Sequence, residues 1–133
     1  MPRPKSEQPT QAELEVLHTL WERGPSTVRE VMDELNRHRR RAYTSVMSLL
    51  NVMVDKGLLN RKPHGRAFIY SPKAGRDKTL GSLVEDLLSR AFSGAADALV
   101  SHLLDRAKPS HAELDEIRKV IQAYQREQKT GGV

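Results

Sequence analysis

The stretch from residue 37 to residue 57 constrains this chain most, because it joins a run of basic residues to two helical faces of opposite character. At helical spacing the apolar face holds Val46, Leu49, Leu50 and Met53, and the polar face holds Thr44, Ser48, Asn51 and Asp55. A slim polar face that follows the cationic residues 37–41 is typical of a recognition helix in the major groove of DNA. An ordinary surface helix beside a solvated basic linker is the alternative, so the rest of the chain must decide.

Two further helices are expected before this stretch. Thr10 and Glu13 fit a capping box, and Gly24-Pro25 ends the helix that they begin. Ser26 or Thr27 is expected to cap the second helix, which ends near residue 36. Residues 1–9 are rich in proline and charge, and they predict a flexible arm.

The apolar pattern changes from helical to strand-like after Gly57. Residues 58–62 and 67–71 predict two short strands around the turn Pro63-His64-Gly65-Arg66. Three helices followed by a basic hairpin describe a winged helix-turn-helix domain, which we assign to residues 10–72. From the recognition helix, the expected DNA-binding residues are Arg41, Tyr43, Thr44, Ser45, Met47 and Ser48. From the linker and the wing, the expected phosphate contacts are Arg39, Arg40, Lys62, His64 and Arg66.

Residues 76–128 predict a second domain of three helices, with breaks at Ser93-Gly94 and Pro109 and a capping box at Ser110 and Glu113. The fold class is therefore mainly α with a small β-hairpin. Three short helices cannot bury such wide apolar stripes alone, so we expect this domain to form a homodimer. Folding back onto the first domain is the alternative. The expected dimer interface contains Leu80, Leu83, Val84, Leu87, Leu88, Phe92, Leu99, Leu103, Leu114, Ile117, Ile121 and Tyr124. The tail from residue 128 is expected to fray.

Composition supports this division of the chain and excludes several classes of function. Residues 1–75 hold 13 Lys+Arg and 8 Asp+Glu, whereas residues 76–133 hold 9 of each, so the net charge of +5 lies in the first part. This asymmetry favours a polyanion-binding domain joined to a domain with another role. The chain has no cysteine, and its 5 histidines lack metal-ligand spacing, so we expect no enzyme activity, metal or other cofactor. The lack of a long apolar run or signal sequence predicts a cytoplasmic protein without membrane insertion.

Specific motifs add a resemblance to a known family. They are Thr27-Val28-Arg29-Glu30-Val31, Ala42-Tyr43-Thr44-Ser45-Val46-Met47, Lys56-Gly57-Leu58-Leu59 and Gly65-Arg66-Ala67-Phe68-Ile69-Tyr70. In these motifs the chain resembles the penicillinase-repressor family, the BlaI/MecI type of bacterial regulator of antibiotic resistance. The resemblance implies a homodimeric repressor that binds double-stranded operator DNA and dimerises through a C-terminal helical domain.

The same resemblance implies release from DNA when a membrane-bound β-lactam sensor, acting as an antirepressor, leads to proteolysis of the C-terminal domain. Well-known members are cut at an Asn-Phe bond, whereas this chain has His102-Leu103 in the corresponding region. Copper-responsive relatives carry a cysteine-rich tail, which this chain lacks. The inducing signal, the operator and the target genes are therefore open. A non-specific DNA-binding protein and a helical protein-interaction module are the alternative functions.

Overall fold

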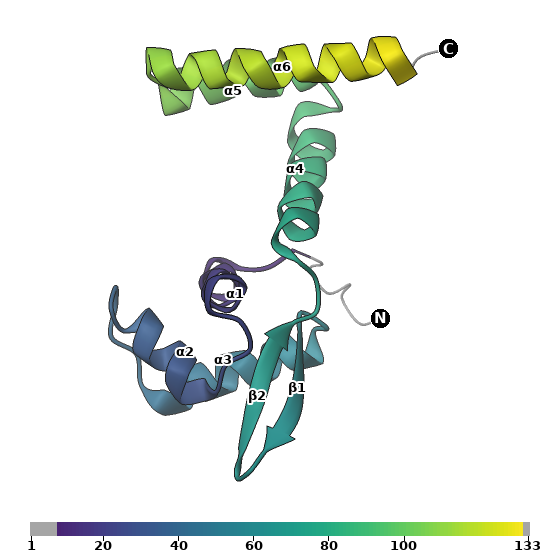
Figure 1. The fold of residues 1–133 in the computed structure, drawn as a ribbon. Coiled ribbons are helices and arrows are strands. Elements are labelled where there is room, and N and C mark those ends of the chain that lie inside the picture. Colours follow the sequence, from purple (N-terminus) through teal and green to yellow (C-terminus); the bar gives the residue numbers. More distant parts are fainter. Residues whose placement is uncertain (1–7, 132–133) are drawn as a thin grey trace. The chain divides into compact units, whose positions relative to one another are not determined.

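The computed structural model describes residues 8–131, and the elements of this part of the chain are shown in Figure 1. They are α1 (Gln11–Arg23), α2 (Val28–Leu35), α3 (Tyr43–Asp55), β1 (Leu59–His64), β2 (Ala67–Pro72), α4 (Arg76–Phe92), α5 (Ala96–Ala107) and α6 (His111–Gly131). This order confirms the expected fold class, which is mainly α with one small hairpin. Most of the arm expected at residues 1–9 lies outside the described residues.

Two compact units divide the chain, Met1–Glu85 and Asp86–Val133, and the boundary between them falls inside α4. The sequence placed the domain boundary earlier, in the linker at residues 73–75. The first turns of α4 belong to the first unit, where Gln8 Nε2 donates a hydrogen bond to Ser82 Oγ at 3.0 Å. A linker signal in the sequence marks where a helix begins, and contacts from distant residues decide which unit holds that helix.

The expected caps fix the starts of α1 and α2. At α1 the Glu13 backbone N–H donates to Thr10 Oγ1 at 3.2 Å, and the Thr10 N–H donates to Glu13 Oε1 at 2.8 Å. Thr27 and Glu30 make the same reciprocal pair at α2, so Thr27 is the N-cap of this helix. Each capping box satisfies backbone donors that the first turn of a helix otherwise leaves without partners.

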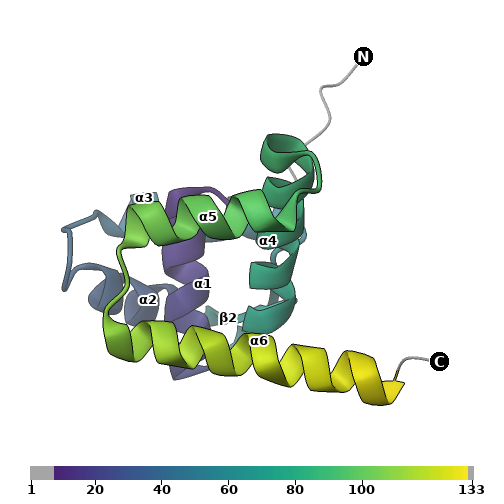
Figure 2. The same cartoon turned by 90° about the horizontal axis from the view of Figure 1, so that it is seen from above.

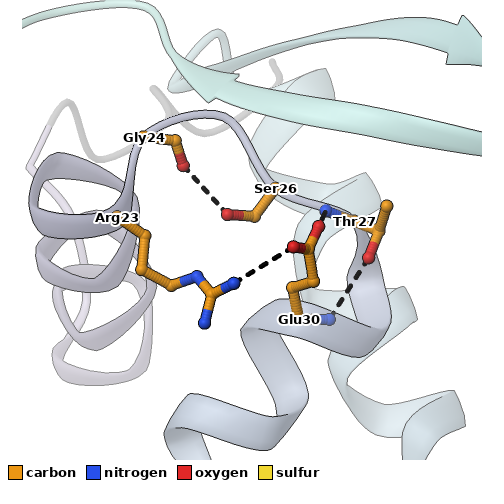
Figure 3. Close-up of polar contacts among 5 residues, drawn as sticks. All are labelled: Arg23, Gly24, Ser26, Thr27 and Glu30. Atoms are coloured by element: carbon orange, nitrogen blue, oxygen red, sulfur yellow. Dashed lines mark hydrogen bonds and ion pairs between the residues drawn. The ribbon is translucent and has the colours of Figure 1, made fainter.

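Ser26, the other candidate cap, instead shapes the turn between α1 and α2 (Figure 3). Its hydroxyl donates to the Gly24 carbonyl at 2.9 Å, while Arg23 Nη2 reaches Glu30 Oε2 at 3.0 Å. The Ser26 backbone also exchanges hydrogen bonds with Tyr70 in β2, at 3.0 and 2.8 Å. The turn is therefore joined to β2 by an isolated antiparallel bridge.

A single hydrophobic core joins the helices and the hairpin of the first unit. Its buried members are Val16, Leu17, Leu20, Val28, Val31, Leu35, Val46, Leu50, Met53, Leu59 and Tyr70. Trp21 packs against this core, and its Nε1 donates to the Ala74 carbonyl at 3.1 Å. The burial of residues from every element before α4 holds α3 and the hairpin in one fixed arrangement.

The hairpin is longer than the sequence predicted, because Pro63 and His64 are part of β1. The strands pair antiparallel in a register that sets Pro63 opposite Phe68 and His64 opposite Ala67. Pro63 is tolerated since alternate residues of a two-stranded ribbon point their N–H positions away from the partner strand. Gly65, with φ of 63°, supplies the left-handed conformation that the tight turn requires. We refer to β1, β2 and this turn as the wing.

The second unit has no buried residue among those that the structure describes. Its helices break at Ser93-Gly94 and at Lys108, and Ser110 Oγ accepts the Glu113 N–H at 3.2 Å, as the capping box expected at these two residues predicts. Figure 2 shows α5 and α6 as separate rods joined by a short connection. Helix α6 continues to Gly131, past the expected fraying point, so its last turns extend as regular helix. No helix among the described residues is long and apolar enough to cross a membrane.

Candidate nucleic-acid interface

Helix α3 has the two faces that the sequence predicts. Val46, Leu50 and Met53 are buried in the core, and Leu49 packs against it. On the other side, Thr44, Ser45 and Ser48 are exposed. Small hydroxyl side chains let a helix approach base edges closely, and each of them can donate or accept a hydrogen bond.

Large apolar side chains also lie on the exposed part of α3. Tyr43 is 46% exposed and Met47, one turn later, is 38% exposed. A single surface helix normally buries such residues, so their exposure is typical of a surface that meets a partner. The sequence-predicted contacts Tyr43, Thr44, Ser45, Met47 and Ser48 therefore occupy one accessible surface at the start of α3.

The basic linker, residues 37–41, splits into two groups. Arg39 and Arg40 are exposed, and Arg37 is paired with Glu34 at 3.3 Å. Arg41 instead turns inward, where Nη2 donates to Glu15 of α1 and only 14% of its side chain is exposed. Its hydrogen bond lowers the pKa of the Glu15 carboxyl.

The inward position of Arg41 differs from the DNA contact expected from the sequence. Its backbone N–H donates to Asn36 Oδ1 at 2.7 Å, and its Nε and Nη1 are the buried side-chain atoms of the described residues that have no hydrogen-bond partner. A guanidinium held in this way joins the linker to α1 and lies largely out of solvent. Of the phosphate contacts expected in the linker, Arg39 and Arg40 are exposed.

The wing carries cations without any nearby acid. From Lys56 to Arg76 the chain has no Asp or Glu, and Lys62, His64 and Arg66 are all exposed. A ribbon with cations and no acidic residue of its own attracts a polyanion. The expected contacts at Lys62, His64 and Arg66 thus lie together near the tip of the wing.

The root of the wing is attached to α3 through Asn51. Its Oδ1 accepts hydrogen bonds from Arg61 Nη1 at 2.8 Å and from the Tyr70 hydroxyl at 3.0 Å. Arg61 belongs to β1 and Tyr70 to β2, and the two are directly opposite in the strand register. The Arg61 guanidinium also lies 4.6 Å from the centre of the Phe68 ring. One amide oxygen therefore fixes both strands of the wing relative to the recognition helix.

A second link fixes α3 to α1. Lys56 Nζ lies 2.8 Å from Glu13 Oε1 and 3.0 Å from Oε2, and the Glu13 side chain is only 3% exposed. Burial raises the pKa of the Glu13 carboxyl, but the hydrogen bonds from Lys56 and Thr10 outweigh it and lower the pKa overall. The ends of α3 are thus held by Arg41 and Lys56, both through carboxylates of α1.

A model of the penicillinase repressor family matches residues 9–123 of the chain. The chain belongs to this family. A penicillinase repressor from Bacillus licheniformis is 25% identical over 125 residues, which cover 94% of this chain and 98% of that protein. Transcriptional regulator BlaI from Mycobacterium tuberculosis (strain ATCC 25618 / H37Rv) is 35% identical over 108 residues, which cover 80% of this chain and 77% of that protein. The solution structure of the DNA binding domain of the repressor BlaI is 30% identical, with a TM-score of 0.49, and the match covers 56% of this chain and 90% of that chain.

For this member of the penicillinase repressor family, the matched residues include the whole surface formed by α3, the linker and the wing. Sequence reasoning placed Asn51 on the polar face of α3 but missed its role at the wing, and it missed the inward position of Arg41. Both depend on partners that are 10 or more residues away along the chain. No group of three or more metal-ligating side chains occurs within the described residues 8–131.

Proposed function

We propose that this protein is a sequence-specific transcriptional repressor that binds double-stranded operator DNA as a homodimer. The observation that carries the proposal is the single cationic surface of the first unit, where the polar face of α3 lies between the linker and the wing. The family supports it, since the relatives named above are a penicillinase repressor and a transcriptional regulator. These relatives are regulators of transcription, which are not enzymes.

In this proposal α3 enters the major groove and reads base edges with Thr44, Ser45 and Ser48. Tyr43 and Met47 supply apolar contacts, for which the thymine methyl group is a suitable partner. Arg39, Arg40, Lys62, His64 and Arg66 contact phosphates on either side. Phosphate contacts position the protein and supply most of the affinity, while contacts to bases select the sequence.

Unburied apolar stripes along α4, α5 and α6 support dimerisation through these three helices. Along α4, Val84 is 53% exposed and Leu87 is 47% exposed, and along α6, Ile121 and Tyr124 are 49% and 62% exposed. The spacing of Leu114, Ile117, Ile121 and Tyr124 is that of a helix–helix seam. A second copy of the chain would remove these surfaces from water. The homodimer interface then comprises Leu80, Leu83, Val84, Leu87, Leu88, Phe92, Leu99, Leu103, Leu114, Ile117, Ile121 and Tyr124.

Release from DNA in this proposal comes from loss of the dimer. Two linked DNA-binding units gain affinity because the second binding step becomes intramolecular, by about 10²- to 10⁴-fold. Disruption or cleavage of the second unit near His102 and Leu103 would end this gain without touching the DNA-contacting residues. Leu103 is 55% exposed on α5, while His102 contacts the Phe92 ring, 5.3 Å between centroids. A membrane-bound sensor with an antirepressor protease is one partner that would act in this way.

The test uses the full chain and a pool of random DNA duplexes. Repeated selection by the purified protein should enrich one sequence with dyad symmetry, because each protomer reads one half-site. The selected duplex should bind at least about 10³-fold more tightly than random duplex at the same salt concentration. Equal affinity for both duplexes would indicate a non-specific DNA-binding protein. No binding to either duplex would indicate a helical protein-interaction module. Sedimentation of the free protein checks the dimer independently.

A further inference from the structure

A groove of about 350 Å³ lies between the start of α2, α3 and the wing, and the charged residues of its lining are all cationic. They are Arg29, Arg61 and Arg66, of which Arg29 is also paired with Asp33 outside the lining, at 3.4 Å. The hollow bordered by α1, α2 and the linker differs, since its lining mixes Glu15, Glu22 and Glu34 with Arg39 and Arg41. The groove beside the wing has cations and no carboxylate in its lining, which is the charge that a phosphate group requires.

Asn51 lines this groove and has a hydrogen-bond donor to offer. A guanidinium has no acceptor, so the amide atom that faces Arg61 must be the oxygen, and the Tyr70 hydroxyl donates to the same atom. This arrangement fixes the orientation of the amide and leaves its nitrogen, Nδ2, without a partner among the described residues. In the part of the chain that the structure describes, the buried side-chain atoms without a partner are Nε and Nη1 of Arg41. Nδ2 of Asn51 is not among them, so it is accessible to solvent. Asn51 therefore offers the groove N–H groups and no free acceptor.

The path of DNA across the proposed interface explains what would occupy the groove. In the proposed complex α3 lies in the major groove and the wing contacts phosphates beside it, so the sugar-phosphate strand that borders the groove lies between them. That strand must pass through the space between α3 and the wing. Within the proposed function, we infer that the groove holds one phosphate of this strand, and that Asn51 Nδ2 donates a hydrogen bond to a non-bridging oxygen of it.

The surrounding residues prepare this site before DNA arrives. Arg61 is held by its hydrogen bond to Asn51 and by the Phe68 ring, so it loses little conformational freedom when a phosphate binds. Arg66 lies nearer the turn of the wing and adds charge to the same groove. Asn51 thus acts twice, as an acceptor that fixes the wing and as a donor to the phosphate.

Asn51→Asp separates these two roles. The carboxylate keeps oxygens that accept from Arg61 and Tyr70, so the wing stays attached, but it replaces the N–H donor with a negatively charged oxygen. Asn60→Asp is the matched control, because it makes the same change one residue before Arg61 on the other face of β1. Binding of both variants and of the wild-type chain is measured on the duplex selected from the random pool.

We expect Asn51→Asp to weaken binding by about tenfold or more and Asn60→Asp by less than about threefold, since a charge-assisted contact is replaced by repulsion only in the first variant. Equal effects of the two variants would overturn the inference. Urea denaturation followed by Trp21 fluorescence checks that both variants keep the fold.

The second measurement locates the phosphate and does not depend on the fold of one variant. Single phosphates of the duplex are replaced in turn by neutral methylphosphonates, and the ratio of wild-type to Asn51→Asp affinity is measured for each. The ratio should fall towards one at a single position per half-site, on the strand between α3 and the wing. A ratio that is the same at every position would refute a seated phosphate. A wild-type chain that selects no duplex would instead contradict the proposed function itself.

Discussion

The ion pair between Glu13 and Lys56 gives the sharpest prediction about stability. Glu13 is nearly fully buried, and its carboxylate accepts hydrogen bonds from the Thr10 N–H and from Lys56 Nζ. Glu13→Ala removes half of a capping box and leaves the Lys56 ammonium without its partner. Loss of the capping interaction costs about 1 kcal/mol. Breaking a fully buried pair costs about 3–5 kcal/mol, which we reduce to about 2 kcal/mol because 20% of the Lys56 side chain reaches water.

Adding the capping contribution to that of the ion pair gives an expected loss of about 3 kcal/mol in the free energy of unfolding. Urea denaturation measures it, and Trp21, the only tryptophan in the sequence, reports on the first unit by fluorescence. With an m-value of about 1 kcal/mol per molar urea, the midpoint should fall by about 3 M. Glu13→Gln keeps an acceptor for the Thr10 N–H, so it should lose less. Glu22→Ala, on the exposed side of the same helix, should stay within about 0.5 kcal/mol of the wild type.

The dependence on pH provides a second readout of the same pair. The folded-state pKa of Glu13 lies below its ordinary value of 4.5, so the ionised carboxylate stabilises the fold above that pH. This contribution is lost as the pH falls below 4.5 and through the lower folded-state pKa. The difference in stability between wild type and Glu13→Ala should therefore shrink on acidification. A difference that is small at pH 7, or one that grows in acid, would refute the proposed stabilisation by Lys56.

Three further predictions concern binding and assembly. Arg66→Ala should weaken binding to all DNA sequences and reduce the slope of log K against log salt by roughly one unit, whereas Arg41→Ala should lower the urea midpoint and leave that slope unchanged. A reduced slope for Arg41→Ala would return this residue to the DNA contacts. Leu87→Asp should give a monomer by sedimentation, because it places a charge in an apolar seam; a persistent dimer would make the seam an intrachain core. A chain of residues 1–101 should bind the selected duplex at least about 10²-fold more weakly than the full chain, and equal affinity would rule out release by loss of the C-terminal helices.

The sequence predicted those features whose physical causes are local. Thr10 with Glu13 and Ser110 with Glu113 form the two predicted capping boxes, and Thr27 is one of the two caps expected for α2, since each of these contacts lies within one helical turn. The burial of Val46, Leu50 and Met53 also follows directly from helical spacing. Local signals of this kind establish the elements and their inward faces, and so they establish the fold class.

Features that depend on distant partners were harder to predict. Arg41 belongs to a run of arginines in which each could contact phosphate, and only its pairing with Glu15, 26 residues away, withdraws it from the surface. The attachment of Asn51 to Arg61 and Tyr70 depends on the exact approach of the wing to α3. The sequence predicts Pro63 in the turn with His64, Gly65 and Arg66, but a ribbon of two strands has room for a proline at an outward-facing position.

The backbone bridge between Ser26 and Tyr70 has a consequence for synthesis on the ribosome. It joins two positions that lie on either side of α2, α3 and β1, and Tyr70 is itself buried in the core. Chains emerge from their N-terminus, so α1 to α3 leave the ribosome before the strand that completes their core exists. Nascent chains shorter than 70 residues would expose Leu17 and Leu50 and attract chaperones. The first unit should therefore fold in one late cooperative step, after β2 has been synthesised.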